Sequence, residues 1–194
     1  MLKKIFYRQP KKKAPEQPAG ADASLWTSPV DFDEAWKRRI ATMASYIKTP
    51  CSVADFGCGM MWLEKLLPPG CTYVPIDFVR RDDRTLVLDL NRDPFPSIHA
   101  EVAFLSGVLE YVENVEAFAQ ELTKAGFQKI ILSYCTLEKF SGLQTRKNLN
   151  WVSHKSLFDL LAIFLPHYSL VGLDDVNANT ILIFDRKDHE GRAI

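Results

Sequence analysis

The sequence predicts an α/β protein with a mixed seven-stranded sheet, made of five parallel strands and a C-terminal antiparallel hairpin, with helices on both faces. Short apolar segments alternate with segments of helical periodicity between residues 31 and 165. Such alternation is typical of βαβ units, whose strands are parallel. Only a short polar connection separates the last two apolar segments, and a connection of that length joins antiparallel neighbours.

Each expected strand is a short apolar segment bounded by glycine, proline or polar residues. The expected strands cover residues 51–57, 72–77, 85–90, 102–107, 129–135, 168–175 and 179–186. The expected helices cover residues 33–48, 61–70, 115–126 and 154–165. Asp31 and Asp33 are both candidates for the cap of the first helix, and Pro50 ends it.

The composition gives the chain no global electrostatic preference. Its 194 residues suit one compact domain with a tail, and its 24 basic and 24 acidic residues cancel. The chain therefore has no overall attraction to nucleic acid or to anionic membranes. No apolar segment approaches the ~20 residues that span a bilayer, and the N-terminal segment lacks the apolar core of a signal peptide. We expect a cytoplasmic protein.

Residues 1–24 predict a basic, disordered arm in front of one folded domain over residues 25–194. The arm begins with a run of lysine and arginine without acidic residues and continues into a segment rich in proline, alanine and glycine. Such a composition buries too little apolar surface to become ordered. One interpretation is a solvated arm. The other is that Ile5, Phe6 and Tyr7, among the lysines, contact an acidic partner or a membrane surface.

A glycine-rich turn follows the first expected strand. Asp55 lies near the end of that strand, and Gly57 and Gly59 allow a tight bend and a close approach of the backbone to a ligand. Asp77 ends the second strand, where a carboxylate can accept hydrogen bonds from ribose hydroxyls. Asp89 ends the third strand, placed to reach an adenine amine. Together these positions predict a nucleoside site at the carboxyl ends of the strands.

The turn favours a cofactor other than a dinucleotide. A dinucleotide-binding turn has a third glycine, which allows close helix packing, and Trp62 occupies that position here. Asp55, two residues before the first glycine, suits a ligand that carries a sulfonium and an ammonium group better than a pyrophosphate. These two residues argue against NAD and FAD.

Residues 51–135 resemble the class I S-adenosylmethionine-dependent methyltransferases, which have a Rossmann-like fold. The motifs are VADFGCG, YVPID, LVLDLNRDPFP and EVAFLSGVLEYVENVEAFAQEL. The resemblance implies S-adenosylmethionine as cofactor, with the glycine turn under its methionine moiety, Asp77 on its ribose and Asp89 with Leu90 on its adenine. The predicted cofactor-binding residues are Asp55, Gly57, Cys58, Gly59, Asp77, Phe78, Asp89, Leu90 and Ser106.

The chain departs from the family pattern at two places. The family usually has a further glycine after the first two, where this chain has Met60 and Met61, and Met60 either narrows the methionine pocket or packs against Trp62. The histidine that is common after Leu-Glu is replaced by Tyr111.

The acceptor is expected over the loops that follow the fourth and fifth strands. The candidate catalytic residues are Glu110, Tyr111 and His154, and no metal is expected. His154 is either exposed at a helix start or a general base, and simple alignment of the acceptor is a third route to catalysis. The loop over residues 136–152 is either a solvated surface or a binding element for a polar acceptor.

The resemblance predicts methyl transfer to an oxygen or nitrogen of a small polar acceptor, for which sugars and polysaccharide precursors are examples. The alternative is a catalytically silent S-adenosylmethionine-binding module that acts through protein partners. A nucleic-acid methyltransferase is disfavoured because residues 106–109 read Ser-Gly-Val-Leu where that class has an Asn/Asp-Pro-Pro-aromatic motif, and because the net charge is zero.

Overall fold

The computed structural model describes residues 34–187. The predicted arm over residues 1–24 and the two candidate caps, Asp31 and Asp33, lie outside this range. Within the range, no helix is long and apolar enough to cross a membrane.

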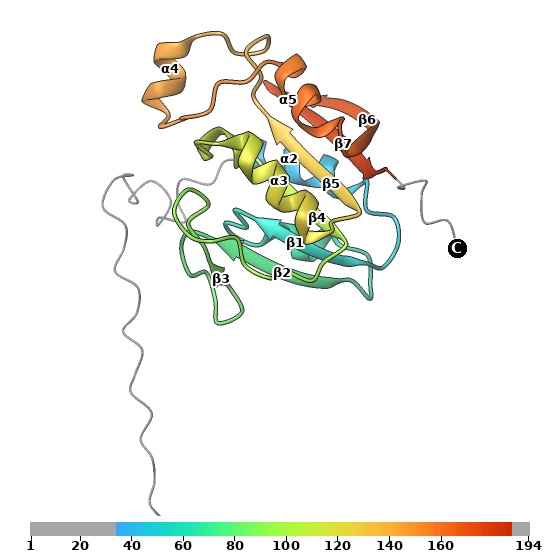
Figure 1. Cartoon of the computed structure of the whole chain (residues 1–194). Coiled ribbons are helices and arrows are strands. Elements are labelled where there is room, and N and C mark those ends of the chain that lie inside the picture. The colour runs from blue at the N-terminus through green and yellow to red at the C-terminus, as the bar shows by residue number, and fades with distance from the viewer. Residues whose placement is uncertain (1–33, 188–194) are drawn as a thin grey trace, which may run out of the picture.

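Within residues 34–187, seven strands form a single mixed sheet in the order β3-β2-β1-β4-β5-β7-β6 (Figure 1). The strands are β1 (Ser52–Phe56), β2 (Thr72–Asp77), β3 (Leu86–Val87), β4 (Val102–Ser106), β5 (Lys129–Tyr134), β6 (Tyr168–Val176) and β7 (Asn179–Arg186). Strands β1 to β5 pair in parallel, whereas β7 is antiparallel to both β5 and β6. The predicted sheet, with its parallel strands and terminal hairpin, is therefore confirmed.

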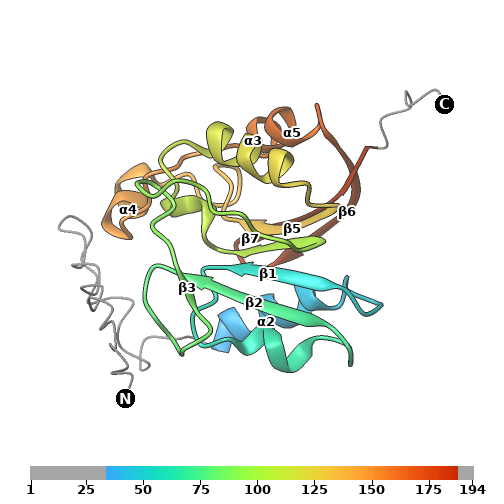
Figure 2. The ribbon, with the colours of Figure 1, turned by 60° about the horizontal axis from the view of Figure 1, so that its bottom comes forward.

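Helices cover both faces of the sheet, as predicted (Figure 2). The helices are α2 (Glu34–Ala44), η2 (Trp62–Leu66), η3 (Leu109–Tyr111), α3 (Val115–Ala125), α4 (Leu143–Asn148) and α5 (Leu157–Phe164), where η marks a 3₁₀ helix. On one face, Met43 of α2 and Leu63 of η2 pack with the strands around Phe104. On the other face, α3 and α5 cover a larger cluster that includes Phe118 and Phe164.

Local sequence signals explain where the helices on the second face begin and end. The Asn114 side chain accepts a hydrogen bond from the Ala117 amide at 2.9 Å, which caps α3, and Gly126 ends α3 in the left-handed conformation. Ser156 and Asp159 form a reciprocal capping box at the start of α5. Helix α5 therefore begins three residues after His154, which lies in the preceding loop.

Several expected elements are shorter in the structure, and the short helices η3 and α4 were not expected. Helix α2 ends at Ala44 instead of residue 48, and α5 begins at Leu157 instead of residue 154. The segment 61–70 contains only the five-residue η2, because Met61 starts it in the left-handed region and Pro68 blocks its extension. The third strand pairs only at Leu86 and Val87, since the chain turns away before Asp89. The loop over residues 136–152 contains the short helix α4.

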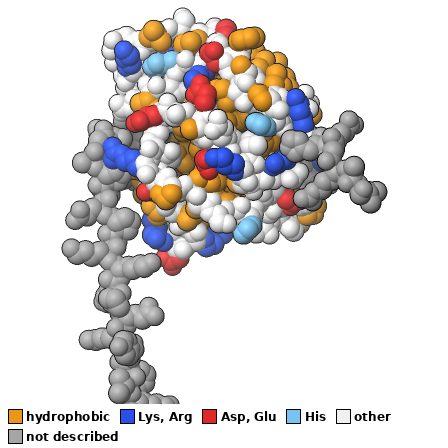
Figure 3. Space-filling model, in the orientation of Figure 1, with side chains coloured by type: hydrophobic (Ala, Val, Ile, Leu, Met, Phe, Trp, Pro, Cys, Tyr) orange, Lys and Arg blue, Asp and Glu red, His pale blue; other side chains and the backbone are white. Residues whose placement is uncertain are grey.

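Apolar side chains gather on the outer surface over α5 and β6 (Figure 3). Phe158 of α5 and Val171 and Leu173 of the edge strand β6 are each more than half exposed. This surface lies at the edge of the sheet formed by β6.

Candidate functional site

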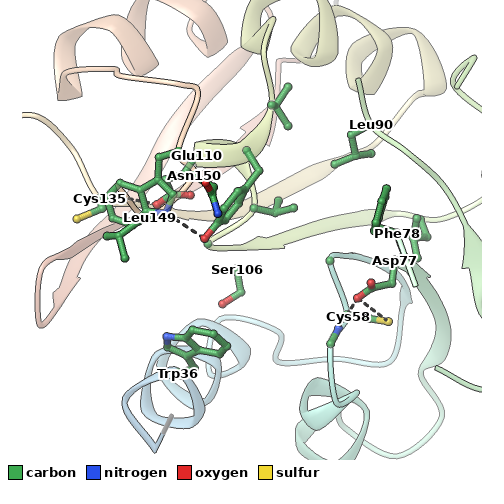
Figure 4. Close-up of a pocket in the computed structure, with 18 of the residues that line it drawn as sticks. Trp36, Cys58, Asp77, Phe78, Leu90, Ser106, Glu110, Cys135, Leu149 and Asn150 are labelled. Carbon is green, nitrogen blue, oxygen red and sulfur yellow. Dashed lines mark hydrogen bonds between the residues drawn. The ribbon is translucent and has the colours of Figure 1, made fainter. Parts of the chain in front are cut away.

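A pocket of about 740 Å³ opens at the carboxyl ends of the central parallel strands. Its lining includes every predicted cofactor-binding residue, together with Glu110 and Tyr111. Figure 4 shows Cys58, Asp77 and Phe78 on one side and Glu110, Cys135, Leu149 and Asn150 on the other, with Ser106 between them. We call the first side the glycine-turn end and the second the η3 end.

The backbone of the glycine turn requires its glycines. Gly57 has φ +69°, and a Cβ at this position would lie 2.9 Å from Cγ2 of Val108. Gly59 has φ +51°. Other residues adopt these left-handed conformations only at a cost. The turn therefore brings its backbone to the pocket without a side chain at Gly57 or Gly59 in front of it.

Asp77 organises the glycine-turn end. Its carboxylate accepts hydrogen bonds from the amides of Gly59 at 2.8 Å and Val79 at 2.9 Å, and Nη2 of Arg81 lies 3.3 Å away. The side chain is 7% exposed. Sγ of Cys58, a weak donor, lies 3.9 Å from Oδ2 and takes the fourth of the roughly four acceptor positions of an ionised carboxylate, so a ligand hydroxyl would bind Asp77 in place of this thiol.

Asp55 is the second buried carboxylate at this end. It is 4% exposed, and the Tyr73 hydroxyl donates a hydrogen bond to its Oδ2 at 2.7 Å. Burial raises the pKa of Asp55 to about 7, and the charge of Asp77 adds to this, whereas the bond from Tyr73 opposes it. A cation in the pocket would favour the ionised form.

Asp89 and Leu90 follow β3 and close the same end. The Asp89 carboxylate accepts a hydrogen bond from the Asn91 amide at 2.9 Å, and the Asp89 amide donates to Asp93 at 2.8 Å. These bonds fix a turn that holds Leu90 against the pocket, opposite Phe78 of the loop after β2 (Figure 4). Leu90 and Phe78 give this part of the pocket an apolar character that suits a flat base.

Sequence reasoning missed Arg39 of α2, which reaches across the end of β4. Its Nε donates to Oγ of Ser106 at 3.0 Å, its Nη2 to the Ser106 carbonyl at 3.3 Å and its Nη1 to Oδ1 of Asn179 at 3.3 Å. A Cβ on Gly107 would lie 2.6 Å from Nη2. Burial lowers the pKa of Arg39. The sequence does contain a signal for this residue, because Arg39 lies three residues after Trp36 on the apolar face of the predicted helix, where a charged residue is unusual.

Glu110 is a buried carboxylate at the η3 end. It is 2% exposed, and its Oε1 accepts a hydrogen bond from the Cys135 amide at 2.8 Å. Its Oε2 is buried without a hydrogen-bond partner within residues 34–187. Burial raises the pKa of Glu110, although the charges of Arg39 and Arg146 act in the opposite direction.

Arg146 holds the loop that forms the outer wall of the η3 end. Its side chain is fully buried and donates to the carbonyls of Cys135, Phe140 and Ser153. Its guanidinium also lies 4.8 Å from the centre of the Trp151 ring. The loop after β5 is thus built around one buried cation rather than being a loose surface segment.

His154 does not line the pocket in the described part of the chain. Its Nδ1 accepts a hydrogen bond from Nε of Arg146 at 3.1 Å, which places the imidazole proton on Nε2 in the neutral form. The structure therefore brings Glu110 and Tyr111 together at the pocket and leaves His154 behind its wall. A role for His154 as general base stays a prediction without geometric support.

No protein-family model and no curated protein matches this sequence. Solved structures match it at low identity. A Burkholderia thailandensis 1,6-didemethyltoxoflavin-N1-methyltransferase with bound S-adenosylhomocysteine has a TM-score of 0.62 and 11% identity, covering 86% of this chain and 85% of that one.

The N-methyltransferase NodS of Bradyrhizobium japonicum, in complex with S-adenosylhomocysteine, has a TM-score of 0.58 and 12% identity, covering 90% and 94% of the two chains. A chain from a Haloferax volcanii complex between the Trm112 methyltransferase activator and a methyltransferase has a TM-score of 0.66 and 10% identity, covering 82% and 92%. The chain described here therefore has the Rossmann-like fold of the class I S-adenosylmethionine-dependent methyltransferases.

Proposed function

We propose that this protein is an S-adenosylmethionine-dependent methyltransferase that modifies an oxygen or nitrogen of a small acceptor. The observation that carries the proposal is that one pocket joins the glycine turn and Asp77 at one end to Glu110 and Tyr111 at the other. The bound S-adenosylhomocysteine in the Burkholderia and Bradyrhizobium structures of the same fold supports the choice of cofactor.

The residues of the glycine-turn end fit this cofactor. The Asp77 carboxylate can accept a ribose hydroxyl in place of its weak contact with Sγ of Cys58, and the exposed backbone of Gly57 leaves room for the methionine moiety. Leu90 and Phe78 provide apolar surface for adenine. Asp55 provides a buried negative charge for a ligand that carries a sulfonium and an ammonium group.

When bound, the cofactor supplies an electrophilic methyl carbon attached to a positively charged sulfur. The protein's contribution is to orient the acceptor and to exclude water, because an aligned pair of reactants loses little further entropy on reaction. Glu110 and Tyr111 follow β4 directly and line the pocket where an acceptor would meet that carbon. Arg39 and Ser106 close the floor between the two ends.

The test of this function begins with calorimetry, using S-adenosylhomocysteine and NAD as ligands. We expect S-adenosylhomocysteine to bind and NAD not to bind. Asp77→Ala removes a charged group that accepts hydrogen bonds from hydroxyls. It should lower the affinity for S-adenosylhomocysteine by about 30-fold, which corresponds to about 2 kcal/mol of binding free energy. The matched control is Asp83→Ala, since Asp83 is exposed and lies outside the pocket lining.

Two outcomes would contradict the proposed function. One is an affinity of the Asp77→Ala protein for S-adenosylhomocysteine equal to that of the parent. The other is tight binding of NAD by the parent protein. If binding follows the expectation, formation of S-adenosylhomocysteine from S-adenosylmethionine with fractionated metabolites then measures transfer.

A further inference from the structure

Several aromatic side chains line the η3 end of the pocket. Trp36 projects from α2 toward the pocket, across from Leu149 and Asn150 (Figure 4). Tyr111 and Trp151 line the pocket beside Glu110. A molecule in this part of the pocket would meet flat apolar surfaces from two separate parts of the chain.

The aromatic wall is held rigidly before any ligand binds. Nε1 of Trp151 donates to the Tyr111 hydroxyl at 3.0 Å, which fixes both rings relative to one another. Phe140 packs edge-on against Trp151 with 5.8 Å between ring centres, and the buried Arg146 lies over the same ring. A rigid aromatic wall favours ligands that are themselves flat, because little side-chain freedom is lost on binding.

Most buried polar groups at this end already have partners. All three nitrogens of the Arg39 guanidinium group donate to Ser106 or Asn179, and the Cys135 amide donates to Oε1 of Glu110. The buried polar atom that remains in this part of the described chain is Oε2 of Glu110. A buried acceptor without a partner is unfavourable, and a ligand that donates one hydrogen bond would remove that penalty.

We infer that the methyl acceptor is a neutral, planar aromatic or heteroaromatic molecule that lies against Trp36, Tyr111 and Trp151 and donates one N–H or O–H group to Oε2 of Glu110. This inference rests on the proposed function. The positive charges of Arg39 and Arg146 favour the ionised form of Glu110, so the ligand itself need not be cationic. The inference narrows the small polar acceptor expected from sequence to an aromatic one, because three aromatic rings line this end and Oε2 of Glu110 is its buried polar atom without a partner in the described range.

The same oxygen atom has a second use. When the lone pair of the acceptor nitrogen or oxygen bonds to the methyl carbon, the carbon–sulfur bond breaks and its electron pair stays on sulfur. The acceptor then loses its proton, and Oε2 of Glu110 is placed to take it and pass it to solvent. Glu110 is thus the residue that selects a donor group on the acceptor and holds the proton that this group gives up.

The test uses fluorescence titrations of the protein saturated with S-adenosylhomocysteine. The probes are umbelliferone, which is planar with one phenolic O–H, and herniarin, its methyl ether. Norharmane, a planar N–H heteroaromatic, and its indole N-methyl derivative form a second pair. We expect the parent protein to bind the donor of at least one pair about tenfold or more tightly than its methylated partner, the size of one hydrogen bond to a charged group.

Glu110→Gln is the informative variant, because an amide oxygen can still accept the bond from Cys135 while an N–H₂ group replaces Oε2. The preference for the donor probe should then fall below about threefold, with S-adenosylhomocysteine binding retained. Glu116→Gln is the matched control and should keep the preference, since Glu116 is exposed, pairs with Lys155 and lies outside the pocket lining. If Glu110 had only a structural role, Glu110→Gln would lower the affinity for the donor probe and for its methylated partner by the same factor.

Several results would overturn the acceptor class. They are equal binding of donor and methylated probes by the parent, an unchanged preference in Glu110→Gln, and binding of UDP-glucose or methyl glucoside with no aromatic probe bound. In each case normal binding of S-adenosylhomocysteine leaves the proposed function standing. Failure of S-adenosylhomocysteine itself to bind contradicts the proposed function instead.

Discussion

At the scale of single residues, Asp55 couples cofactor binding to pH. Burial raises its pKa to about 7, above the ordinary value, so the folded protein without ligand resists ionising this group. Its contribution to stability is therefore lost as pH rises from about 4 through about 7. A cationic cofactor favours the ionised carboxylate and lowers this pKa. Binding of S-adenosylmethionine should thus release a proton near neutral pH and tighten as pH rises.

The measurement is calorimetry of S-adenosylmethionine binding at several pH values, in pairs of buffers with different ionisation enthalpies. Between about pH 6 and pH 8 we expect the affinity of the parent protein to rise severalfold, with up to one proton released per site. Asp55→Asn should show neither effect, whereas Asp83→Asn should behave like the parent. A flat affinity profile without proton release in the parent protein would exclude this coupling.

The sequence predicts the pocket residues that lie at strand ends better than the pocket residues whose position depends on tertiary packing. Asp55, Asp77 and Asp89 each lie at or next to the end of an apolar segment, and parallel strands bring their carboxyl ends to one edge, so their meeting at the pocket follows from the pattern alone. Arg39 precedes the first strand and reaches the pocket only because α2 packs under the sheet. The unpartnered oxygen of Glu110 is likewise a property of three-dimensional packing and has no signature in the sequence.

At the scale of elements, Arg146 determines whether the loop after β5 keeps its shape. Arg146→Met removes the donors to three backbone carbonyls and a hydroxyl, those of Cys135, Phe140, Ser153 and Tyr134. Each buried acceptor left without a partner costs about 1–3 kcal/mol. We expect the free energy of unfolding, measured by urea denaturation, to fall by about 3 kcal/mol or more.

Arg80→Met is the control for this prediction, since Arg80 is exposed and should change stability by less than about 0.5 kcal/mol. Arg146→Lys should recover only part of the loss, because an ammonium cannot reproduce the planar set of donors. If Arg146→Met unfolds at the same urea concentration as Arg80→Met, the loop does not depend on this cation.

The loop after β5 also shows a limit of predicting helices from the spacing of apolar residues. The segment 136–152 contains too few apolar residues to predict a helix, and α4 is a short helix whose Arg146 points into the protein. A sequence pattern assigns a basic residue to the surface by default. His154, chosen for its place near a helix start, instead accepts a hydrogen bond from that arginine. Short elements of this kind are defined by one buried contact rather than by a repeated pattern.

At the scale of the whole molecule, the number of strands and the hairpin were predictable, but the strand order was not. The bounds of β2 and β7 equal the predicted ranges, because turn residues and alternation mark both ends of each. Insertion of β7 between β5 and β6 is a long-range pairing that local patterns do not encode. The exposed apolar surface over α5 and β6 (Figure 3) is also a consequence of that order, since it makes β6 the edge strand.

Residues 1–24 form the arm that the sequence predicts in front of the folded domain. The two apolar clusters that cover the faces of the sheet are made of residues from Ile40 onward, and every residue lining the pocket in the described range comes from Trp36 onward. Deletion of residues 1–24 should therefore shift the melting temperature by less than about 2 °C, which is the smallest shift expected from losing 1 kcal/mol in a domain of this size. The affinity for S-adenosylhomocysteine should stay within about twofold of the parent value. Differential scanning calorimetry and titration calorimetry on the full and shortened chains measure both quantities. A loss of several degrees in the shortened chain would show that the folded domain extends into residues 1–24.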